Sequence, residues 1–164
     1  AFGVAAAAGG ARATTNVDAV PSALARGQAN YALNGLPQDG RTFWKSDVLD
    51  ALKRAARQGA RWDLVVLHPP PVVSGGDRGR RIDPVRDLAR LVERCRAVLA
   101  PGGLLLLAWT ASAPDDAALI AAAQLGQPVW RGGPGEDFLP TAARPGLRAF
   151  VFEAPLAGRG TAAP

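Results

Sequence analysis

The sequence has 164 residues, of which 48% are hydrophobic and 20% are charged. This length suits one globular domain with a buried core, and no apolar run approaches the roughly 18 residues that a membrane-spanning helix needs. The single cysteine, Cys95, excludes a disulfide framework and a cysteine-ligated zinc site, and we expect no bound metal. The net charge of +5 is compatible with a nucleic-acid partner.

The first third of the chain alternates between helices and strands. We expect helices at residues 1–8, 21–33 and 48–58, and strands at residues 13–18 and 42–44. Pro21 suits the first turn of a helix, and Asn34-Gly35 is typical of a left-handed cap at its end. Ser46 or Asp47 is expected to cap the third helix.

The stretch from Trp62 to Pro71 is the most informative in the chain. A run of apolar and β-prone residues stops at His68, the only histidine, which is followed by three prolines. A continuous apolar run of this length predicts a strand buried on both faces of a parallel sheet. Because proline cannot donate a hydrogen bond to the ladder, the strand must end there, in a rigid extended loop.

A polar, basic loop at residues 72–83 separates this strand from the later elements. Apolar residues at three- and four-residue spacing predict a helix that starts at Asp83-Pro84. Its buried face is expected to hold Val85, Leu88, Leu91, Val92, Cys95, Val98 and Leu99. A turn at Pro101-Gly102-Gly103 then leads into a fully buried strand. We expect this strand at residues 104–109 and a helix at residues 115–124. A closing pair of strands is expected at residues 129–130 and 149–152.

This alternation predicts an α/β domain with a Rossmann-like, doubly wound and mostly parallel sheet. We expect the domain to span residues 1–155 and residues 156–164 to form a disordered tail. The sequence shows no internal repeat and no boundary for a second domain.

Three polar residues fall at the carboxyl ends of successive predicted strands: Asp18, Asp47 and His68. Ligands of open α/β sheets bind beyond these strand ends, where a carboxylate can accept both hydroxyls of a ribose. An acid and the following amide, as in Asp47-Val48, can face a purine ring. However, Asp before a helix is also an ordinary cap, and a lone histidine at a strand end is often structural. Both interpretations stay open.

Several segments are similar to motifs of the class I S-adenosylmethionine-dependent methyltransferases. They resemble most the branch that methylates C5 of cytosine in large-subunit ribosomal RNA, and the resemblance covers nearly the whole chain. The matching segments are Ala1-Phe2-Gly3-Val4, Asn16-Val17-Asp18, Leu33-Asn34-Gly35-Leu36, Ser46-Asp47-Val48, residues 61–70 and residues 99–104.

The resemblance implies S-adenosylmethionine as the cofactor and RNA as the substrate. It assigns cofactor binding to Phe2, Gly3, Asp18, Ala19, Asp47, Val48 and His68, with Asp18 on the ribose and Asp47 and Val48 at the adenine. It assigns catalysis to the motif of His68, Pro69 and Pro70, in which His68 would be a general base if its pKa lies near neutrality.

The chain departs from the family pattern at three places. The central first strand of the family, with most of its glycine-rich turn, is missing from this sequence, so we expect a longer gene product and a gap in the sheet. His68 stands where the family has aspartate. Thr110 falls on or near the position of the branch's catalytic cysteine, and threonine is a far poorer nucleophile. This chain should therefore not methylate C5 of cytosine.

The sequence thus predicts a methyltransferase domain that acts on RNA, at an exocyclic amine or an oxygen rather than through a cysteine nucleophile. The alternative is a catalytically inactive relative that serves as a binding or structural module. A dehydrogenase-like domain ranks last, because no Gly-x-Gly-x-x-Gly follows any strand. We expect a cytoplasmic protein; an organellar one is possible, since the Ala-rich start with Arg12 resembles a transit peptide. The sequence does not indicate the oligomeric state.

Overall fold

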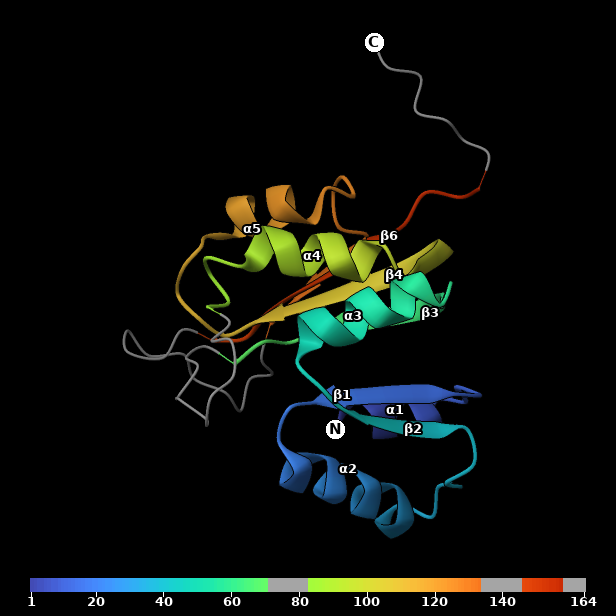
Figure 1. Cartoon of the computed structure of the whole chain (residues 1–164). Coiled ribbons are helices and arrows are strands. Elements are labelled where there is room, and N and C mark those ends of the chain that lie inside the picture. Colours follow the sequence, from blue (N-terminus) through green and yellow to red (C-terminus); the bar gives the residue numbers. More distant parts are fainter. Residues whose placement is uncertain (71–82, 134–145, 158–164) are drawn as a thin grey trace. The chain divides into compact units, whose positions relative to one another are not determined.

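The structure is a computed structural model of the chain, and it describes residues 1–70, 83–133 and 146–157. The chain divides into two compact units, Ala1–Ala55 and Ala56–Pro164 (Figure 1). Among the described residues, no helix combines the length and the apolar character that crossing a membrane requires. The predicted domain end at residue 155 stays a prediction, and most of the predicted tail lies outside the described residues.

The first unit contains two helices, two strands and most of a third helix: α1 (Phe2–Ala8), β1 (Thr14–Asp18), α2 (Pro21–Leu33), β2 (Arg41–Lys45) and α3 (Val48–Arg57). Strands β1 and β2 pair in parallel, with Asp18 opposite Lys45. Helices α1 and α2 both pack on β1. The order expected from the sequence is confirmed, including Pro21 at the start of α2 and Gly35, with a φ of 65°, after its end.

Tyr31 of α2 organises the interior of the first unit and is only 1% exposed. Its hydroxyl lies 2.8 Å from the hydroxyl of Thr14 and accepts a 3.3 Å hydrogen bond from Nδ2 of Asn16. Its ring meets the edge of Phe43, with the two centroids 5.8 Å apart. Because a buried phenol needs hydrogen-bond partners, this one side chain fixes α2 to both strands.

Gly3 of α1 lies directly against this hydrogen-bonded group. A Cβ atom placed on Gly3 would lie 2.3 Å from Oδ1 of Asn16 and 2.3 Å from Oη of Tyr31. Both distances are far inside van der Waals contact, so close packing requires glycine here although glycine is a poor helix former. The packing explains Gly3 without a ligand, and its predicted role in cofactor binding stays a prediction.

The described part of the second unit contains β3 (Trp62–Leu67), α4 (Leu88–Arg96), β4 (Leu99–Trp109), α5 (Asp116–Ala123), β5 (Trp130–Gly132) and β6 (Arg148–Glu153). The four strands form a sheet in the order β3-β4-β6-β5. Strands β3 and β4 are parallel, whereas β6 is antiparallel to both β4 and β5. The predicted closing strand pair is thus confirmed.

The core of the second unit lies between this sheet and helices α4 and α5, which pack against each other (Figure 1). Leu105, Leu107 and Trp109 alternate along β4, and each is at most 1% exposed. Phe152 and Phe150 of β6 lie opposite the two leucines and are buried as well. Since side chains alternate between the two faces of a strand, these five share one face.

Three side chains predicted to be buried are exposed in the structure: Leu64, Val85 and Leu104. Leu64 of β3 is 46% exposed and Leu104, its partner on β4, is 36% exposed. These exposed side chains show that β3 is not buried on both faces, and among the described strands it pairs only with β4. Val85 is 43% exposed, because it lies in a turn before α4 in which Oδ1 of Asp83 accepts a 3.0 Å hydrogen bond from the Val85 N–H.

The predicted turn Pro101-Gly102-Gly103 lies inside β4 as an irregularity. Strand β3 pairs with β4 at Leu99 and again from Leu104 onward, so residues 100–103 bulge out of the ladder. Gly102 adopts a φ of 72° there, a conformation that favours glycine. The glycines therefore allow β4 to begin before the predicted turn, instead of after it.

The described strands form two separate sheets and not one. Strand β1 pairs with β2 in the first unit, and β3 pairs with β4 in the second. Among the described strands, β1 and β3 are therefore each paired on one side only. The gap that the sequence predicts in the sheet stays a prediction.

Candidate functional site

The first unit brings two of the predicted carboxylates to one edge of a sheet. Asp18 is the last residue of β1, and Asp47 follows the end of β2 by two residues. Because β1 and β2 are parallel, their carboxyl ends lie at the same edge, and the Ser46 N–H donates a 3.1 Å hydrogen bond to the carbonyl oxygen of Asp18. This is the edge at which open α/β sheets bind ligands.

Both carboxylates also cap the backbone that follows them. Oδ1 of Asp18 accepts a 2.8 Å hydrogen bond from the Val20 N–H. Oδ1 of Asp47 accepts hydrogen bonds from the Leu49 and Asp50 N–H groups, at 2.8 and 3.3 Å, and so caps α3. Capping is therefore confirmed for Asp47, and Asp18 stabilises its own turn. Within the described chain, Oδ2 of each has no hydrogen bond, so each retains an oxygen that fits a hydroxyl or amine of a ligand.

The other predicted cofactor residues of the first unit lie near element ends. Phe2 is the first residue of α1 and is 43% exposed. Ala19 is exposed in the loop between β1 and α2, next to Asp18. Val48 is the first residue of α3, where a helix has N–H groups without an intrahelical acceptor. Their predicted contacts with a cofactor stay predictions.

His68, Pro69 and Pro70 lie in the second unit, directly after β3. The prolines end the strand at Leu67, as the sequence predicts. The His68 side chain is exposed overall, yet its pKa is lowered from the ordinary value of 6.5 because the imidazole loses part of its hydration. The neutral imidazole, which can accept a proton, is therefore the dominant form at neutral pH.

We expect a proton NMR titration to give His68 a pKa below 6.5 in the folded chain. The spectrum contains one histidine, so the signal needs no assignment. Since the unfolded chain binds the proton more readily, stability should fall as the pH drops from 6.5 through the lowered folded pKa. The same titration in denaturant is the control and should return the ordinary value. A folded pKa at or above 6.5 would contradict the prediction.

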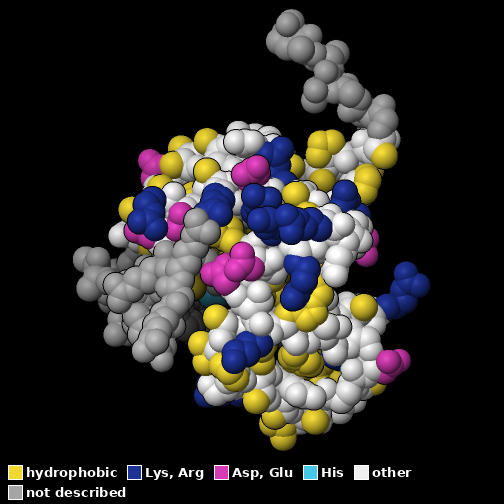
Figure 2. Space-filling view, in the orientation of Figure 1, with side chains coloured by type: hydrophobic (Ala, Val, Ile, Leu, Met, Phe, Trp, Pro, Cys, Tyr) yellow, Lys and Arg dark blue, Asp and Glu magenta, His cyan; other side chains and the backbone are white. Residues whose placement is uncertain are grey.

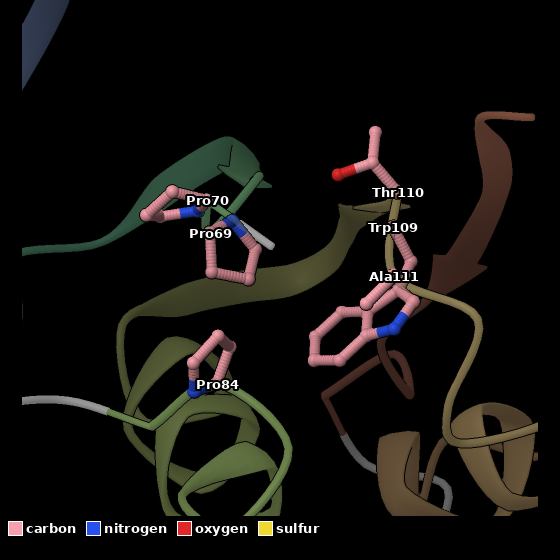
Figure 3. Close-up of a pocket in the computed structure, with 6 residues that line it drawn as sticks. All are labelled: Pro69, Pro70, Pro84, Trp109, Thr110 and Ala111. Atoms are coloured by element: carbon pink, nitrogen blue, oxygen red, sulfur yellow. The ribbon is translucent and has the colours of Figure 1, made fainter. Parts of the chain in front are cut away.

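A small hollow opens beside the ends of β3 and β4 (Figure 3). Its lining residues are Pro69, Pro70, Pro84, Trp109, Thr110 and Ala111, and its interior has no room for a water molecule. Two predicted catalytic residues thus line one hollow, whereas His68 is not part of the lining. Ordinary ligand pockets are far larger, roughly 300–1,000 Å³, so the hollow admits a ligand group only if its walls move.

Thr110 contributes a buried polar atom to this hollow. Its Oγ1 has no surface open to water and no hydrogen-bond partner in the part of the chain that the structure describes. In Figure 3 the hydroxyl points toward Pro69 and Pro70. Leaving a buried hydroxyl unpaired costs about 1–3 kcal/mol, so the Thr110 side chain is a local cost to stability.

Arg148, at the start of β6, holds the segment that follows β4. Its Nη1 donates a 2.9 Å hydrogen bond to the carbonyl of Pro114 and lies 3.0 Å from Oδ1 of Asp116. Its Nη2 donates to the carbonyl of Ala111, which lines the hollow. This contact was not predicted, because nothing in a sequence marks two segments so far apart as partners.

Cys95 is excluded as a nucleophile by its place in the core. It lies on the buried face of α4 and is 2% exposed. Burial raises the pKa of its thiol to about 12. The thiolate, which is the reactive form, is therefore essentially absent at neutral pH.

Basic side chains cover part of the second unit. Helix α4 and the turn before it carry Arg86, Arg90, Arg94 and Arg96, and Figure 2 shows dark blue side chains over α4 with acidic ones among them. Nη1 of Arg96 donates a hydrogen bond to Oε1 of Gln124. The basic loop predicted at residues 72–83, with Arg78, Arg80 and Arg81, lies almost wholly outside the described residues.

Parallel strand pairs with polar residues at their carboxyl ends are typical of Rossmann-like α/β proteins that bind a ligand there. A family model described as S-adenosylmethionine-dependent methyltransferase matches residues 1–129. The chain therefore belongs to this family, whose cofactor is S-adenosylmethionine, and the predicted resemblance is confirmed.

Curated relatives share this part of the chain. Ribosomal RNA large subunit methyltransferase K/L of Hahella chejuensis is 40% identical over 101 residues, which are 62% of this chain and 14% of that protein. Ribosomal RNA large subunit methyltransferase I of Aeromonas salmonicida is 32% identical over 105 residues, which are 64% of this chain and 26% of that protein. The chain thus spans about a quarter or less of the length of these relatives.

Solved structures confirm the fold. The S-adenosylmethionine-dependent methyltransferase from Agrobacterium tumefaciens superposes with a TM-score of 0.72 at 24% identity, over 90% of this chain and 50% of that one. A protein crystallised in complex with S-adenosylhomocysteine superposes with a TM-score of 0.81 at 23% identity, over 93% of this chain and 42% of that one. At these identities the likeness shows the Rossmann-like α/β fold.

Proposed function

We propose that this chain is part of a methyltransferase that transfers the methyl group of S-adenosylmethionine to large-subunit ribosomal RNA without a cysteine nucleophile. The observation that carries the proposal is the pair of carboxylates at the carboxyl edge of β1 and β2, each with Oδ2 left for a ligand. Two curated relatives that match this chain are named as methyltransferases of this RNA.

The first unit is proposed to hold the adenosine part of the cofactor. Oδ2 of Asp18 would accept hydrogen bonds from the ribose hydroxyls, while Oδ1 keeps its bond to the Val20 N–H. The Asp47 carboxylate and the N–H of Val48 would face the adenine, with Phe2, Gly3 and Ala19 near the rest of the cofactor. When bound, S-adenosylmethionine supplies an electrophilic methyl group on a sulfonium.

The second unit is proposed to hold the methyl acceptor. Pro69 and Pro70 present apolar rings to the hollow after β3, and His68 would take the proton that an exocyclic amine or hydroxyl loses. Its lowered pKa favours this role, because the imidazole is neutral before the reaction. Positioning of the acceptor would supply much of the rate, as it does for transfers that need no covalent intermediate.

The test is methyl transfer by the protein expressed from its complete gene. Tritiated S-adenosylmethionine and an unmodified large-subunit ribosomal RNA transcript are the substrates. We expect label in the RNA, and we expect the Cys95→Ala variant to keep the wild-type rate because Cys95 is buried with a raised pKa. Loss of transfer in Cys95→Ala, with the variant still folded by circular dichroism, would show that a cysteine nucleophile is used after all.

An inactive binding module is the second candidate. The observation that favours it is His68 in place of the family's aspartate, because a site that no longer catalyses a reaction can lose its catalytic aspartate. It predicts cofactor binding by calorimetry without any methyl transfer. Turnover above background excludes it.

A further inference from the structure

The hollow after β3 and β4 combines apolar walls with one polar atom at its side. Rings of Pro69, Pro70 and Pro84 and the indole of Trp109 line it (Figure 3). The indole N–H of Trp109 is already used, because it donates a 2.9 Å hydrogen bond to the carbonyl of Ala113. The Thr110 hydroxyl is the side-chain polar group that the lining leaves unpaired.

We propose that the Thr110 hydroxyl recognises the edge of an RNA base whose ring lies against Pro69 and Pro70. The inference rests on the proposed function, for which it names a residue that determines acceptor specificity. Enzymes that modify bases take the base out of the stack and read its edge by hydrogen bonds in a pocket with flat apolar walls. A hydroxyl suits that task, because it can donate to a ring nitrogen or carbonyl and accept from an amine.

The geometry sets a condition on this contact. Oγ1 of Thr110 has no surface open to water, so the base edge reaches it only by displacing part of the lining. Pro70 is exposed, and its ring lies on the side to which the hydroxyl points (Figure 3). Shifts of side-chain size are common when a binding site is occupied. The Thr110 hydroxyl, unpaired without RNA, would then form a hydrogen bond with the polar edge of the base.

The experiment compares Thr110→Val, which keeps the shape and removes the hydroxyl, with Thr110→Ser, which keeps the hydroxyl. The assay is the transfer of tritiated methyl groups to the unmodified ribosomal RNA transcript, and thermal melts are run on every variant. We expect Thr110→Val to melt at or above the wild-type temperature, because it removes an unpaired buried group. We expect its kcat/KM to fall about fivefold to tenfold, the effect of one lost hydrogen bond, and Thr110→Ser to stay within about threefold of wild type.

Ser112→Ala is the matched control. It removes an exposed hydroxyl from the same segment and should change neither kcat/KM nor the melt. A Thr110→Val protein that folds and keeps the wild-type kcat/KM would overturn the inference while the proposed function stands. Absence of transfer by the wild-type protein would overturn the proposed function, and the inference with it.

Discussion

In the Asp18→Asn variant, we expect the affinity for S-adenosylmethionine to fall roughly 10- to 100-fold, measured by calorimetry on the protein expressed from its complete gene. Asparagine keeps an Oδ1 that can accept the Val20 N–H, so the turn after β1 should survive. It loses the charge and the Oδ2 acceptor proposed for the ribose hydroxyls. Hydrogen bonds to charged groups contribute about 1.5–3 kcal/mol each, which gives this range of affinities.

Asp39→Asn is the control for Asp18→Asn. Asp39 lies in the same unit, and its Oδ1 accepts a 3.0 Å hydrogen bond from the Gly40 N–H in a comparable exposed turn. Its replacement should leave the affinity unchanged. If Asp18→Asn bound the cofactor within about twofold of wild type, Asp18 would be a turn-forming residue only.

The Gly3→Ala variant should lose about 1–3 kcal/mol of unfolding free energy in urea, followed by circular dichroism. The added methyl group would lie 2.3 Å from oxygen atoms of both Asn16 and Tyr31, which must separate. Overpacking of this kind costs about 1–3 kcal/mol, and the disturbed hydrogen bonds of the Tyr31 hydroxyl add to it. These losses exceed the gain of about 1 kcal/mol from replacing glycine by alanine in a helix.

Two further variants isolate the clash at Gly3. Tyr31→Phe removes one of the two oxygens, so the Gly3→Ala, Tyr31→Phe double variant should lose less than the sum of the single losses, by about 1 kcal/mol. Gly27→Ala, in α2, is the matched control: its Cβ would meet Phe43 at an ordinary 3.6 Å. It should be neutral or stabilising, by up to about 1 kcal/mol. A Gly3→Ala chain as stable as wild type would contradict the packing argument.

Local signals in the sequence were sufficient to predict the order of elements. Proline and glycine act on their own backbone, so Pro69 and Pro70 mark the end of β3 and Gly35 follows the end of α2. Asp47 caps α3 for the same local reason. The exposure of Leu64 was not predictable in this way, because burial depends on what covers a strand and not on the strand's own composition.

Local sequence patterns also could not predict the packing of Gly3 and Thr110. Nothing in the sequence relates Gly3 to Tyr31, which stand on different helices, and the requirement for glycine appears only once both atoms have positions. Thr110 could be noted from the family resemblance as an altered position. Its unpaired hydroxyl became visible only with the surrounding atoms in place. Side chains whose role depends on a single distant neighbour carry no periodic signature.

The hydrogen bonds of the Arg148 guanidinium affect when the proposed acceptor site can form during synthesis. Arg148 belongs to β6, near the end of the described chain, yet it bonds the carbonyls of Ala111 and Pro114 beyond β4. During synthesis, therefore, the wall that carries Thr110 emerges well before the residue that secures it. A nascent chain released before Arg148 would contain Pro69, Pro70 and Thr110 but would lack the hydrogen bonds that hold the segment after β4. We therefore expect the proposed acceptor site to form only after β6 has been synthesised.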